Sequence, residues 1–577
     1  MSSRNYLTAT ICRRLRRAEI QHLVLTITEV GTPVNHQADT SSNVTDPKPG
    51  APVILEAKQR FSRSIIWALQ RNFYQNQGIQ AWMSAGVPHY ITNNPFIADA
   101  YARVVFGWLR DWYMSGEITL DQPVYLIELG TGTGRFAFQF MKQFFRLLDQ
   151  SPLHQIKVKY VMTDFVGQNS AFWQSHPALQ PFIASGRVDI ADFDAEQLDK
   201  PLYLRLSAET LTTASVKNPV AVLANYFFDV LPADLFRLRQ GALYETLVTV
   251  TSDQTEPNLA DSDIIKRMGV SYDDVEPALV ESYYTDPILN QVLFGYRDQL
   301  GDTMLLIPAL GAQVIGQFNR LANGRLMLVM CEKGHSQLTD LAKIGSPGIA
   351  VQGGFSLMVN IHAIRQYVQQ LGGEVLDPTH RSPTLYTAAL LTGQTGTNYF
   401  DARLAYKQTF DENGPADFFL IKKLIESHCA ELSLEQILAY LRQSQWDSYV
   451  FHRCFPTLMK RLESYPLPLR EDVRNAIANI WDIYFHLNDP QDLPFCLATT
   501  LQLIGDFPGA IKLFEQSLSL YGDDPNTFYN LAACSLELEQ FALTLDYLNK
   551  TLAIAPDFES ALAMREHVIN ELKMPSS

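Results

Sequence analysis

The chain has 577 residues, of which 47% are hydrophobic and 19% are charged. A single hydrophobic core stops growing at roughly 250–300 residues, so this length predicts two or more domains, and the apolar content excludes a mainly disordered chain. The net charge of −15 argues against the broad basic surface of a nucleic-acid-binding protein, so we expect no nucleic-acid partner.

The sequence contains no pattern typical of a metal site or a membrane span. Its six cysteines form no CxxC motif and its 12 histidines form no HExxH motif, so we expect free thiols and no bound metal. There is no run of about 18 apolar residues, so no membrane-spanning helix is predicted. We therefore expect a cytoplasmic protein.

Residues 1–52 are predicted to be an N-terminal extension and linker. Five arginines precede the first acidic residue, Glu19, and a polar stretch with Pro and Gly follows at 37–52. Mitochondrial transit peptides are likewise rich in arginine and poor in acids. We interpret the segment as a basic extension, and mitochondrial targeting is the alternative.

A helical segment is predicted over 55–120. Apolar residues recur at helical spacing in Ala57–Gln75 and again in Ala98–Tyr113. Between them, Val87–Pro95 contains polar side chains and two prolines, which predicts a loop.

From Val124 onwards, short apolar runs alternate with helical segments, which indicates an α/β fold with a mainly parallel, Rossmann-like sheet. The predicted strands are Val124–Glu128, Val158–Asp164, Val188–Ala191, Val220–Ala224 and Arg325–Cys331. The predicted helices are Phe136–Leu148, Ala309–Leu321 and His362–Leu371. A polar and aromatic region at about 240–303 looks like an insertion, so we assign 53–400 to one α/β domain.

Almost no strand signal follows Pro415, and the end of the chain contains a repeat with a period of 34 residues. The aligned pairs are Leu497 with Leu531, Phe507 with Phe541, Phe514 with Leu548, and Leu518 with Leu552. The pattern resembles the tetratricopeptide repeat, whose stacked helix pairs present a concave groove. We predict a helical linker over 401–488 and repeats over 489–577 with a capping helix at Ser560–Leu572. The alternative is an irregular α-helical domain without a groove.

A glycine-rich turn separates the first predicted strand of the sheet from the next helix. It reads Glu128-Leu129-Gly130-Thr131-Gly132-Thr133-Gly134. Glycines allow a tight turn and close approach of a ligand to the backbone, and the helix N-terminus adds N–H donors. The GxGxG spacing after an acid resembles motif I of class I S-adenosylmethionine-dependent methyltransferases, not the GxGxxG dinucleotide fingerprint. The resemblance implies that S-adenosyl-L-methionine is bound by Glu128, Gly130, Thr131, Gly132 and Gly134.

Acidic residues end the next two predicted strands. Asp164 is placed to accept hydrogen bonds from both ribose hydroxyls of a nucleotide cofactor. The methyltransferase resemblance places Asp192 near the adenine amino group and Phe193 near the adenine ring. For either aspartate taken alone, a solvated loop acid is the alternative.

The fourth predicted strand ends in Asn225-Tyr226-Phe227-Phe228-Asp229-Val230-Leu231-Pro232. This segment resembles the Asn-Glu-Phe-Phe-Asp-Ala-Leu-Pro signature of the MidA family of methyltransferases, and the resemblance covers roughly 60–395. Ligands bind outside the carboxyl ends of the strands in such sheets, so we expect Asn225, Phe228 and Asp229 to face the substrate. Tyr226 replaces the family's Glu, which removes a carboxylate able to orient a guanidinium and weakens the arginine methylation that the family implies.

Two functions are compatible with these patterns. The leading hypothesis is an S-adenosyl-L-methionine-dependent methyltransferase that acts on a protein recruited by the helical repeats. The alternative is a methyltransferase-like scaffold or assembly factor that binds protein partners without catalysis. Tyr226 favours the scaffold, whereas Glu128 and the three glycines of the turn favour the enzyme.

Overall fold

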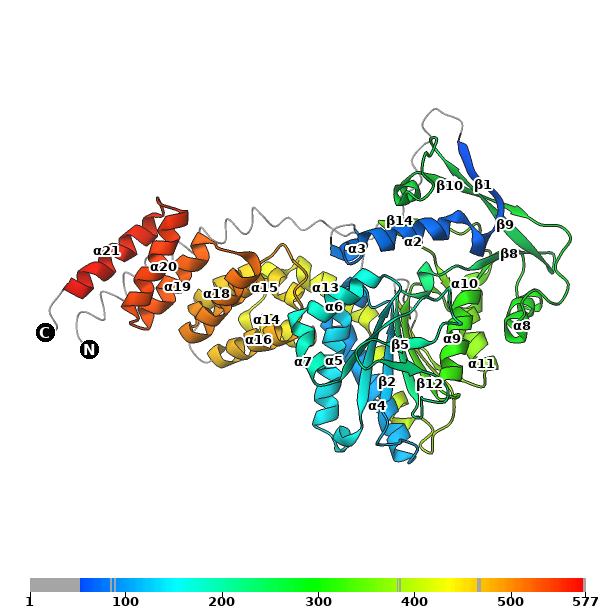
Figure 1. Ribbon diagram of the computed structural model, residues 1–577, viewed down its shortest axis with the longest axis horizontal. Coiled ribbons are helices and arrows are strands. Elements are labelled where there is room, and N and C mark those ends of the chain that lie inside the picture. Colours follow the sequence, from blue (N-terminus) through cyan, green and yellow to red (C-terminus); the bar gives the residue numbers. More distant parts are fainter. Residues whose placement is uncertain are drawn as a thin grey trace. The chain divides into compact units, whose positions relative to one another are not determined.

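The computed structural model describes residues 52–83, 86–87, 90–380, 382, 385–463 and 469–573. These residues form two compact units, one made of 52–424 with Phe485–Leu487 and one made of the described parts of 425–484 and 488–573 (Figure 1). The predicted N-terminal extension lies, apart from residue 52, outside the described residues.

The first unit is built on a mixed sheet of nine strands. In spatial order they are β17 (Glu374–Leu376), β18 (Tyr386–Leu391), β12 (Leu326–Glu332), β7 (Val220–Asn225), β2 (Val124–Leu129), β3 (Val158–Asp164), β4 (Val188–Asp192), β5 (Leu202–Leu204) and β6 (Glu209–Leu211). The strands from β12 to β4 are parallel, and the outer ones pair antiparallel. The predicted α/β class is confirmed, while the four antiparallel strands were not predicted.

Helices cover both faces of this sheet. Alternate side chains of β2 enter opposite cores, Val124 and Leu126 on one face and Ile127 and Leu129 on the other. The first core includes α4 (Pro95–Met114), α5 (Arg135–Asp149), α6 (Gly167–Ser175) and α12 (Phe400–Tyr406), and the second includes α8 (Pro287–Gly295), α9 (Ala309–Leu321) and α11 (Ile361–Gln370). Because both faces are covered, the carboxyl edge of the parallel strands is the place left for a ligand.

A second, antiparallel sheet joins the start of this unit to the predicted insertion. Its strands are β1 (Val53–Arg60), β9 (Ala242–Ser252), β8 (Asp234–Arg239) and β11 (Thr303–Ile307), with β10 (Met268–Asp274) also paired to β9. The helix predicted from Ala57 was wrong at its start, because β1 continues to Arg60 and α2 (Ile65–Gln77) begins only after a turn. The strand is fixed by pairing with distant β9, which local helical spacing does not reveal. Glu56 on β1 then accepts hydrogen bonds from the backbone N–H of Ile65 at the first turn of α2.

Short elements complete the unit. They are α3 (Gln80–Met83), α7 (Gln180–Ala184), α10 (Leu338–Leu341), the strand pair β13 (Gly334–His335) and β16 (Val359–Asn360), and the pair β14 (Ala350–Gln352) and β15 (Gly354–Ser356).

The α/β unit extends past the boundary predicted at residue 400. The buried carboxylate of Asp111 on α4 accepts hydrogen bonds from the N–H groups of Asp401 and Ala402 at 3.1 and 2.8 Å, which caps α12. The two helices approach so closely that a Cβ at Gly107 would lie 2.6 Å from the carbonyl oxygen of Asp401. Glycine at this position therefore permits the packing of α12 on α4.

Beyond Pro415 the described chain is helical. The helices are α13 (Pro415–Ser427), α14 (Leu434–Gln443), α15 (Ser448–Glu463), α16 (Arg470–Ile483), α17 (Leu493–Leu503), α18 (Phe507–Tyr521), α19 (Pro525–Glu537), α20 (Phe541–Ile554) and α21 (Glu559–Lys573). Helix α17 packs on α18, α19 on α20, and α20 on α21. Phe507 and Phe541, which align in the predicted repeat, are the first residues of α18 and α20.

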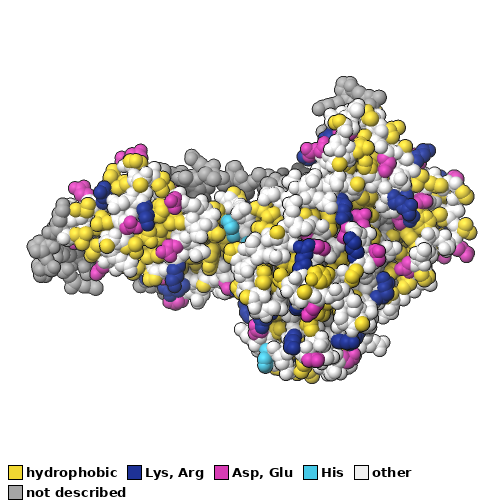
Figure 2. Space-filling view, in the orientation of Figure 1, with side chains coloured by type: hydrophobic (Ala, Val, Ile, Leu, Met, Phe, Trp, Pro, Cys, Tyr) yellow, Lys and Arg dark blue, Asp and Glu magenta, His cyan; other side chains and the backbone are white. Residues whose placement is uncertain are grey.

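Membrane spans, metal ligands, thiols and surface charge can be judged only for the residues that the structure describes. In that part of the chain no helix has the length and apolar character needed to cross a membrane, and no group of His, Cys, Asp and Glu is arranged to hold a metal ion. The five described cysteines are free thiols, and the fold brings the Sγ atoms of Cys429 and Cys454 to 3.5 Å. On the described surface that Figure 2 shows, Lys and Arg lie among Asp and Glu and form no single basic patch.

Candidate active site

The glycine-rich turn joins β2 to α5 at the carboxyl edge of the large sheet. Gly130, Gly132 and Gly134 have φ values of +64°, +58° and +83°, a left-handed backbone that costs other residues about 1–2 kcal/mol each. Gly134 is the N-cap of α5, so the unpaired N–H groups of the first helical turn and the positive end of the helix dipole lie beside the turn. This backbone is suited to binding a ligand that carries a carboxylate or phosphate.

Asp164 braces this turn from the end of β3. Its Oδ2 accepts hydrogen bonds from Gly132 N at 3.1 Å and Asn169 Nδ2 at 3.0 Å, and its Oδ1 accepts one from Val166 N at 3.0 Å. The side chain is buried, and burial raises the pKa of Asp164 although the three donors act against this shift. A backbone hydrogen bond from Phe165 also lowers the pKa of Asp164, and contact of Asp164 with the ribose hydroxyls stays a prediction.

The turn is also tied down at Thr131, and a buried acid lies next to it. Thr131 N donates to Thr163 O at 2.8 Å, and its Oγ1 accepts from Thr163 N at 3.1 Å. Burial raises the pKa of Glu128 to about 8, although the hydroxyls of Thr131 and Tyr160 lower it. The Oε2 of Glu128 is buried and has no hydrogen-bond partner among the described residues. Glu128 therefore retains an acceptor that a bound ligand would satisfy.

Aromatic side chains of α2 and α3 cover the turn. A Cβ at Gly132 would lie 3.2 Å from the ring of Trp82, and Tyr74 stacks on Trp82 with ring centroids 5.5 Å apart. Burial raises the pKa of Tyr74, and the charges of Asp229 and Asp164 raise it further. A Cβ at Gly130 would lie 3.5 Å from the ring of Phe227, so the glycine-rich turn and the segment that follows β7 meet at the carboxyl edge of two adjacent strands. Neither Tyr74 nor Trp82 was predicted to belong to the site.

Asp192 and Phe193 lie at the end of β4. The carboxylate of Asp192 is 56% exposed and forms an ion pair with Arg205. The ring of Phe193 packs against those of Phe227 and Phe318, with centroids 6.4 and 5.3 Å apart. Phe193 also borders a cavity of about 340 Å³, which gives a planar ligand space beside the ring. Contact of Asp192 and Phe193 with adenine stays a prediction.

Asn225 ends β7 and is held by a tyrosine on α4. The hydroxyl of Tyr101 donates to Asn225 Oδ1 at 2.5 Å, which leaves the amide Nδ2 as the group able to face a substrate. The next residue, Tyr226, has a φ of +48°, a left-handed conformation that is costly for an aromatic residue and is often found at functional sites. The side chain of Tyr226 packs against the core that contains α4 and α5.

Two buried carboxyls, Asp229 and Glu332, follow the neighbouring strands β7 and β12. Glu332 Oε1 accepts hydrogen bonds from the N–H groups of Phe227 and Phe228 at 2.8 and 2.9 Å. Burial raises the pKa of Asp229 to about 7, although its backbone hydrogen bond and the charge of Lys333 lower it. Burial and the charge of Asp229 raise the pKa of Glu332. A carboxyl that is half ionised near neutral pH is suited to general-base catalysis.

The ring of Phe228 lies in the core. Its side chain is 3% exposed, and a Cβ at Gly311 on α9 would lie 2.8 Å from its ring. Contact of Phe228 with a substrate stays a prediction. Asp229 Oδ1 is buried and has no hydrogen-bond partner among the described residues. It can therefore accept a proton or a hydrogen bond.

The fold and this site define a mixed α/β protein that presents a glycine-rich turn and several buried carboxyls at one edge of its sheet. Residues 107–326 match the model of a family described as "putative S-adenosyl-L-methionine-dependent methyltransferase". This range includes the turn, Asp164, Asp192 and the segment 225–229. S-adenosyl-L-methionine is the cofactor of the matched family, which confirms the predicted cofactor.

Solved structures match more weakly. Two crystal structures from Burkholderia thailandensis each have 12% sequence identity to this chain and a TM-score of 0.35. Each match covers 60% of this chain and 96% of the crystallised chain. One is the native structure of an uncharacterized superfamily protein, and the other is of a superfamily member bound to S-adenosyl-homocysteine. The APC/C hetero-tetramer Cut9-Hcn1 has 17% identity and a TM-score of 0.21, and covers 29% of this chain and 32% of that one. TM-scores this low do not establish a shared fold. No curated protein matches this chain.

The residues of the site fit S-adenosyl-L-methionine at three points. The left-handed glycines leave the backbone of the turn free of side chains. The first turn of α5 offers N–H donors for a carboxylate. Glu128 Oε2 has no hydrogen-bond partner among the described residues, so it could receive a hydrogen bond from a hydroxyl or amino group.

Proposed function

We propose that this chain is an S-adenosyl-L-methionine-dependent methyltransferase that acts on a protein substrate. The observation that carries the proposal is that the glycine-rich turn and the segment 225–229 follow two adjacent parallel strands, β2 and β7, and that a Cβ at Gly130 would lie 3.5 Å from the ring of Phe227. The bound cofactor supplies an activated methyl group, so the protein supplies position, orientation and electrostatics. In this assignment Asn225 Nδ2 orients the substrate group that receives the methyl. Asp229 either takes a proton from that group or binds it when it is positively charged.

The order of the parallel strands supports a Rossmann-like arrangement for this unit. Strands β3 and β4 lie on one side of β2, and β7 and β12 lie on the other. The chain therefore changes direction across the sheet between β2 and β7, which is where open α/β sheets bind their ligands. The glycine-rich turn follows β2, and Asn225 and Asp229 follow β7.

An arginine side chain is one acceptor compatible with the site. Tyr226 cannot supply the carboxylate that a guanidinium would need at that position, but Asp229 is buried nearby with an oxygen that has no partner among the described residues. A carboxylate can bind a guanidinium through two parallel hydrogen bonds. The cationic acceptor would in turn favour the ionised form of Asp229.

The C-terminal helices are proposed to recruit the protein substrate. Their support is the 34-residue period together with two consecutive helix pairs, α17 with α18 and α19 with α20, whose second helices begin one period apart at Phe507 and Phe541. A scaffold without catalysis is the second candidate function. It is favoured by Tyr226 and by the aromatic cover of Trp82 over the turn.

Substituting Gly132 tests cofactor binding at the turn. Gly132→Ala would force a side chain into a left-handed residue at +58° and within 3.2 Å of Trp82. Gly186 is the matched control, because its φ is +71° but no atom lies within 4 Å of a Cβ placed at that position. Both changes should lower the free energy of unfolding by about 1–2 kcal/mol.

Isothermal titration of the full chain with S-adenosyl-L-methionine distinguishes the two variants. We expect the wild type and Gly186→Ala to bind alike and Gly132→Ala to bind at least roughly tenfold more weakly, equivalent to about 1.4 kcal/mol. No binding by the wild type would refute the proposed function. Binding without any methyl transfer to proteins of a cell extract would favour the scaffold.

Removing residues 490–577 tests whether the C-terminal helices bind the protein partner while the other unit binds the cofactor. The shortened chain should lose its protein partner in a pull-down, because the predicted groove is absent. Its affinity for S-adenosyl-L-methionine should be unchanged, because the turn, Asp164 and Glu128 belong to the other unit. Circular dichroism and thermal unfolding of the shortened chain provide the control for folding. A parallel loss of cofactor affinity in a folded protein would contradict this assignment.

A further inference from the structure

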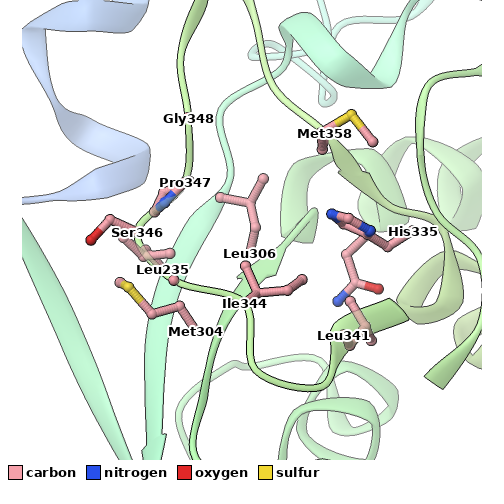
Figure 3. Close-up of a pocket in the computed structure, with 12 residues that line it drawn as sticks. Leu235, Met304, Leu306, His335, Leu341, Ile344, Ser346, Pro347, Gly348 and Met358 are labelled. Carbon is pink, nitrogen blue, oxygen red and sulfur yellow. The ribbon is translucent and has the colours of Figure 1, made fainter. Parts of the chain in front are cut away.

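A second cavity lies between the antiparallel sheet and the chain that follows β12 (Figure 3). Its volume is about 100 Å³. The apolar side chains that line it are Leu235, Met304, Leu306, Leu341, Ile344 and Met358. A cavity of about 150 Å³ with apolar walls binds the six heavy atoms of benzene, so this one has room for about four, such as a carboxamide group and the carbon attached to it. It shares no lining residue with the cavity beside Phe193.

One wall of the cavity carries a buried amide group with an unused donor. Asn360 is 1% exposed, and its Nδ2 has no hydrogen-bond partner among the described residues. The orientation of the amide is fixed, because Oδ1 accepts hydrogen bonds from Ala363 N at 3.0 Å and the hydroxyl of Tyr296 at 3.5 Å. Nδ2 therefore cannot exchange places with Oδ1 without losing the cap of α11. A buried donor left unpaired costs about 1–3 kcal/mol, which a ligand with an acceptor would recover.

The second polar group of the cavity is an imidazole. Figure 3 shows His335 on the same side as Met358, facing the space also lined by Ile344 and Leu306. Burial lowers the pKa of His335, although Asp340 acts against this shift. The ring is therefore neutral at pH 7 and has one nitrogen able to accept a hydrogen bond.

Backbone hydrogen bonds join one wall of the cavity to the candidate active site. Leu357 N donates to the carbonyl oxygen of Asp229 at 3.3 Å, and Val359 N donates to that of Lys333 at 3.0 Å. Met358 and Asn360 lie next to these two anchored residues in the chain, and both line the cavity. A group bound in the cavity would thus be held by the same segment that is hydrogen-bonded to the residue proposed as the base.

We propose that this cavity binds an uncharged primary carboxamide on a short apolar stem, the group at the end of a glutamine side chain of the protein substrate. The carbonyl oxygen accepts a hydrogen bond from Asn360 Nδ2, the amide NH₂ donates to the ring of His335, and the stem contacts the apolar walls. The assignment to a substrate rests on the proposed methyltransferase function, whereas the binding of a carboxamide does not.

Three probes of equal size test the chemistry of the cavity in the full chain. Propionamide carries both an acceptor and a donor, 2-butanone carries the acceptor alone, and propionate replaces the donor by a negative charge. Saturation-transfer NMR titrations measure the affinity of each probe. We expect propionamide to bind at least roughly fivefold more tightly than either of the others, since each lacks one buried hydrogen bond.

Two variants localise the binding. Asn360→Ser keeps an oxygen that caps α11 but removes Nδ2, and its shorter hydroxyl is withdrawn from the position of that donor, so propionamide binding should weaken by roughly tenfold. Ile344→Trp should fill the cavity and abolish binding, because the side chain of Ile344 lines this space (Figure 3). Asn530→Ser and Ile554→Trp are the matched controls, since neither residue lines the cavity and Ile554 is exposed.

The results separate this inference from the proposed function. Equal binding of the three probes, no binding by the wild type, or full binding by Ile344→Trp would overturn the carboxamide site. Each variant is also titrated with S-adenosyl-L-methionine, and unchanged cofactor affinity shows that the fold is intact. Selective propionamide binding by a chain that does not bind the cofactor would retain the cavity as a carboxamide site and reject the methyltransferase.

Discussion

Replacing Asp164 by alanine is expected to abolish measurable S-adenosyl-L-methionine binding and to lower the free energy of unfolding by about 3 kcal/mol. The carboxylate accepts hydrogen bonds from Gly132 N, Val166 N and Asn169 Nδ2. Alanine would leave these three donors in a buried site without an acceptor. Because one donor belongs to the glycine-rich turn itself, the turn would lose its brace and its ligand-binding geometry. Denaturant unfolding and calorimetric titration measure the two effects.

Asp192→Asn is the matched control for this substitution. Asp192 stands at the corresponding end of the adjacent strand, but it is 56% exposed and paired with Arg205. Exposed ion pairs contribute about 0–1 kcal/mol, so the stability should hardly change. A moderate loss of cofactor affinity in a stable protein would support contact of Asp192 with adenine. Equal losses of stability in Asp164→Ala and Asp192→Asn would contradict the bracing role of Asp164.

The central sheet could be predicted from the sequence because its signals are local. Runs such as Val124–Leu129 are apolar at almost every position, which is typical of a parallel strand buried on both faces. A turn with three glycines marks the following bend, and polar residues such as Asn225 mark the end of a strand. Carboxyl ends of parallel strands share one edge, so the site could be located before any contact was known.

The missed features depend on contacts between distant parts of the chain. The strand β1 exists because β9 pairs with it, and its own sequence has apolar residues at spacings that also suit a helix. Trp82 and Tyr74 carry no motif, and only packing on Gly132 places them over the turn. The packing of Phe228 could not be predicted for the same reason, because its neighbour Gly311 lies on a helix well beyond the fourth strand.

The second large effect is expected at Asp229. Asp229→Asn should reduce methyl transfer by roughly 10²–10⁴-fold if the carboxylate takes a proton from the acceptor. In the wild type the rate should rise with pH through about 7, because burial raises the pKa of Asp229 to about 7 and only the ionised form is a base. The formation of S-adenosyl-homocysteine in the presence of a protein extract measures both the rate and its pH dependence.

Glu332→Gln tests which of the two buried carboxyls ionises near pH 7. Glutamine keeps an oxygen for the N–H groups of Phe227 and Phe228 and replaces a carboxyl whose own pKa burial and the charge of Asp229 raise well above its ordinary value. Because Glu332 stays protonated while Asp229 ionises, the rise in rate should remain near pH 7 in Glu332→Gln. Loss of the rise in Glu332→Gln would identify Glu332 as the carboxyl that ionises, and a rise that persists in Asp229→Asn would exclude Asp229 as the titrating base.

The carboxyl of Asp229 also makes the free energy of unfolding depend on pH, and stability should fall as the pH rises. The pKa of Asp229 is higher in the folded chain than in the unfolded one, so the folded state binds more protons between roughly pH 4 and 7. Its contribution to stability is therefore complete below pH 4 and is lost as the pH rises through 7. Asp229→Asn removes this ionisation and should reduce the loss of unfolding free energy between pH 5 and 8 by about 1–3 kcal/mol. Guanidinium unfolding of both proteins at the two pH values measures the difference, and an identical pH dependence would show that Asp229 is already ionised at pH 5.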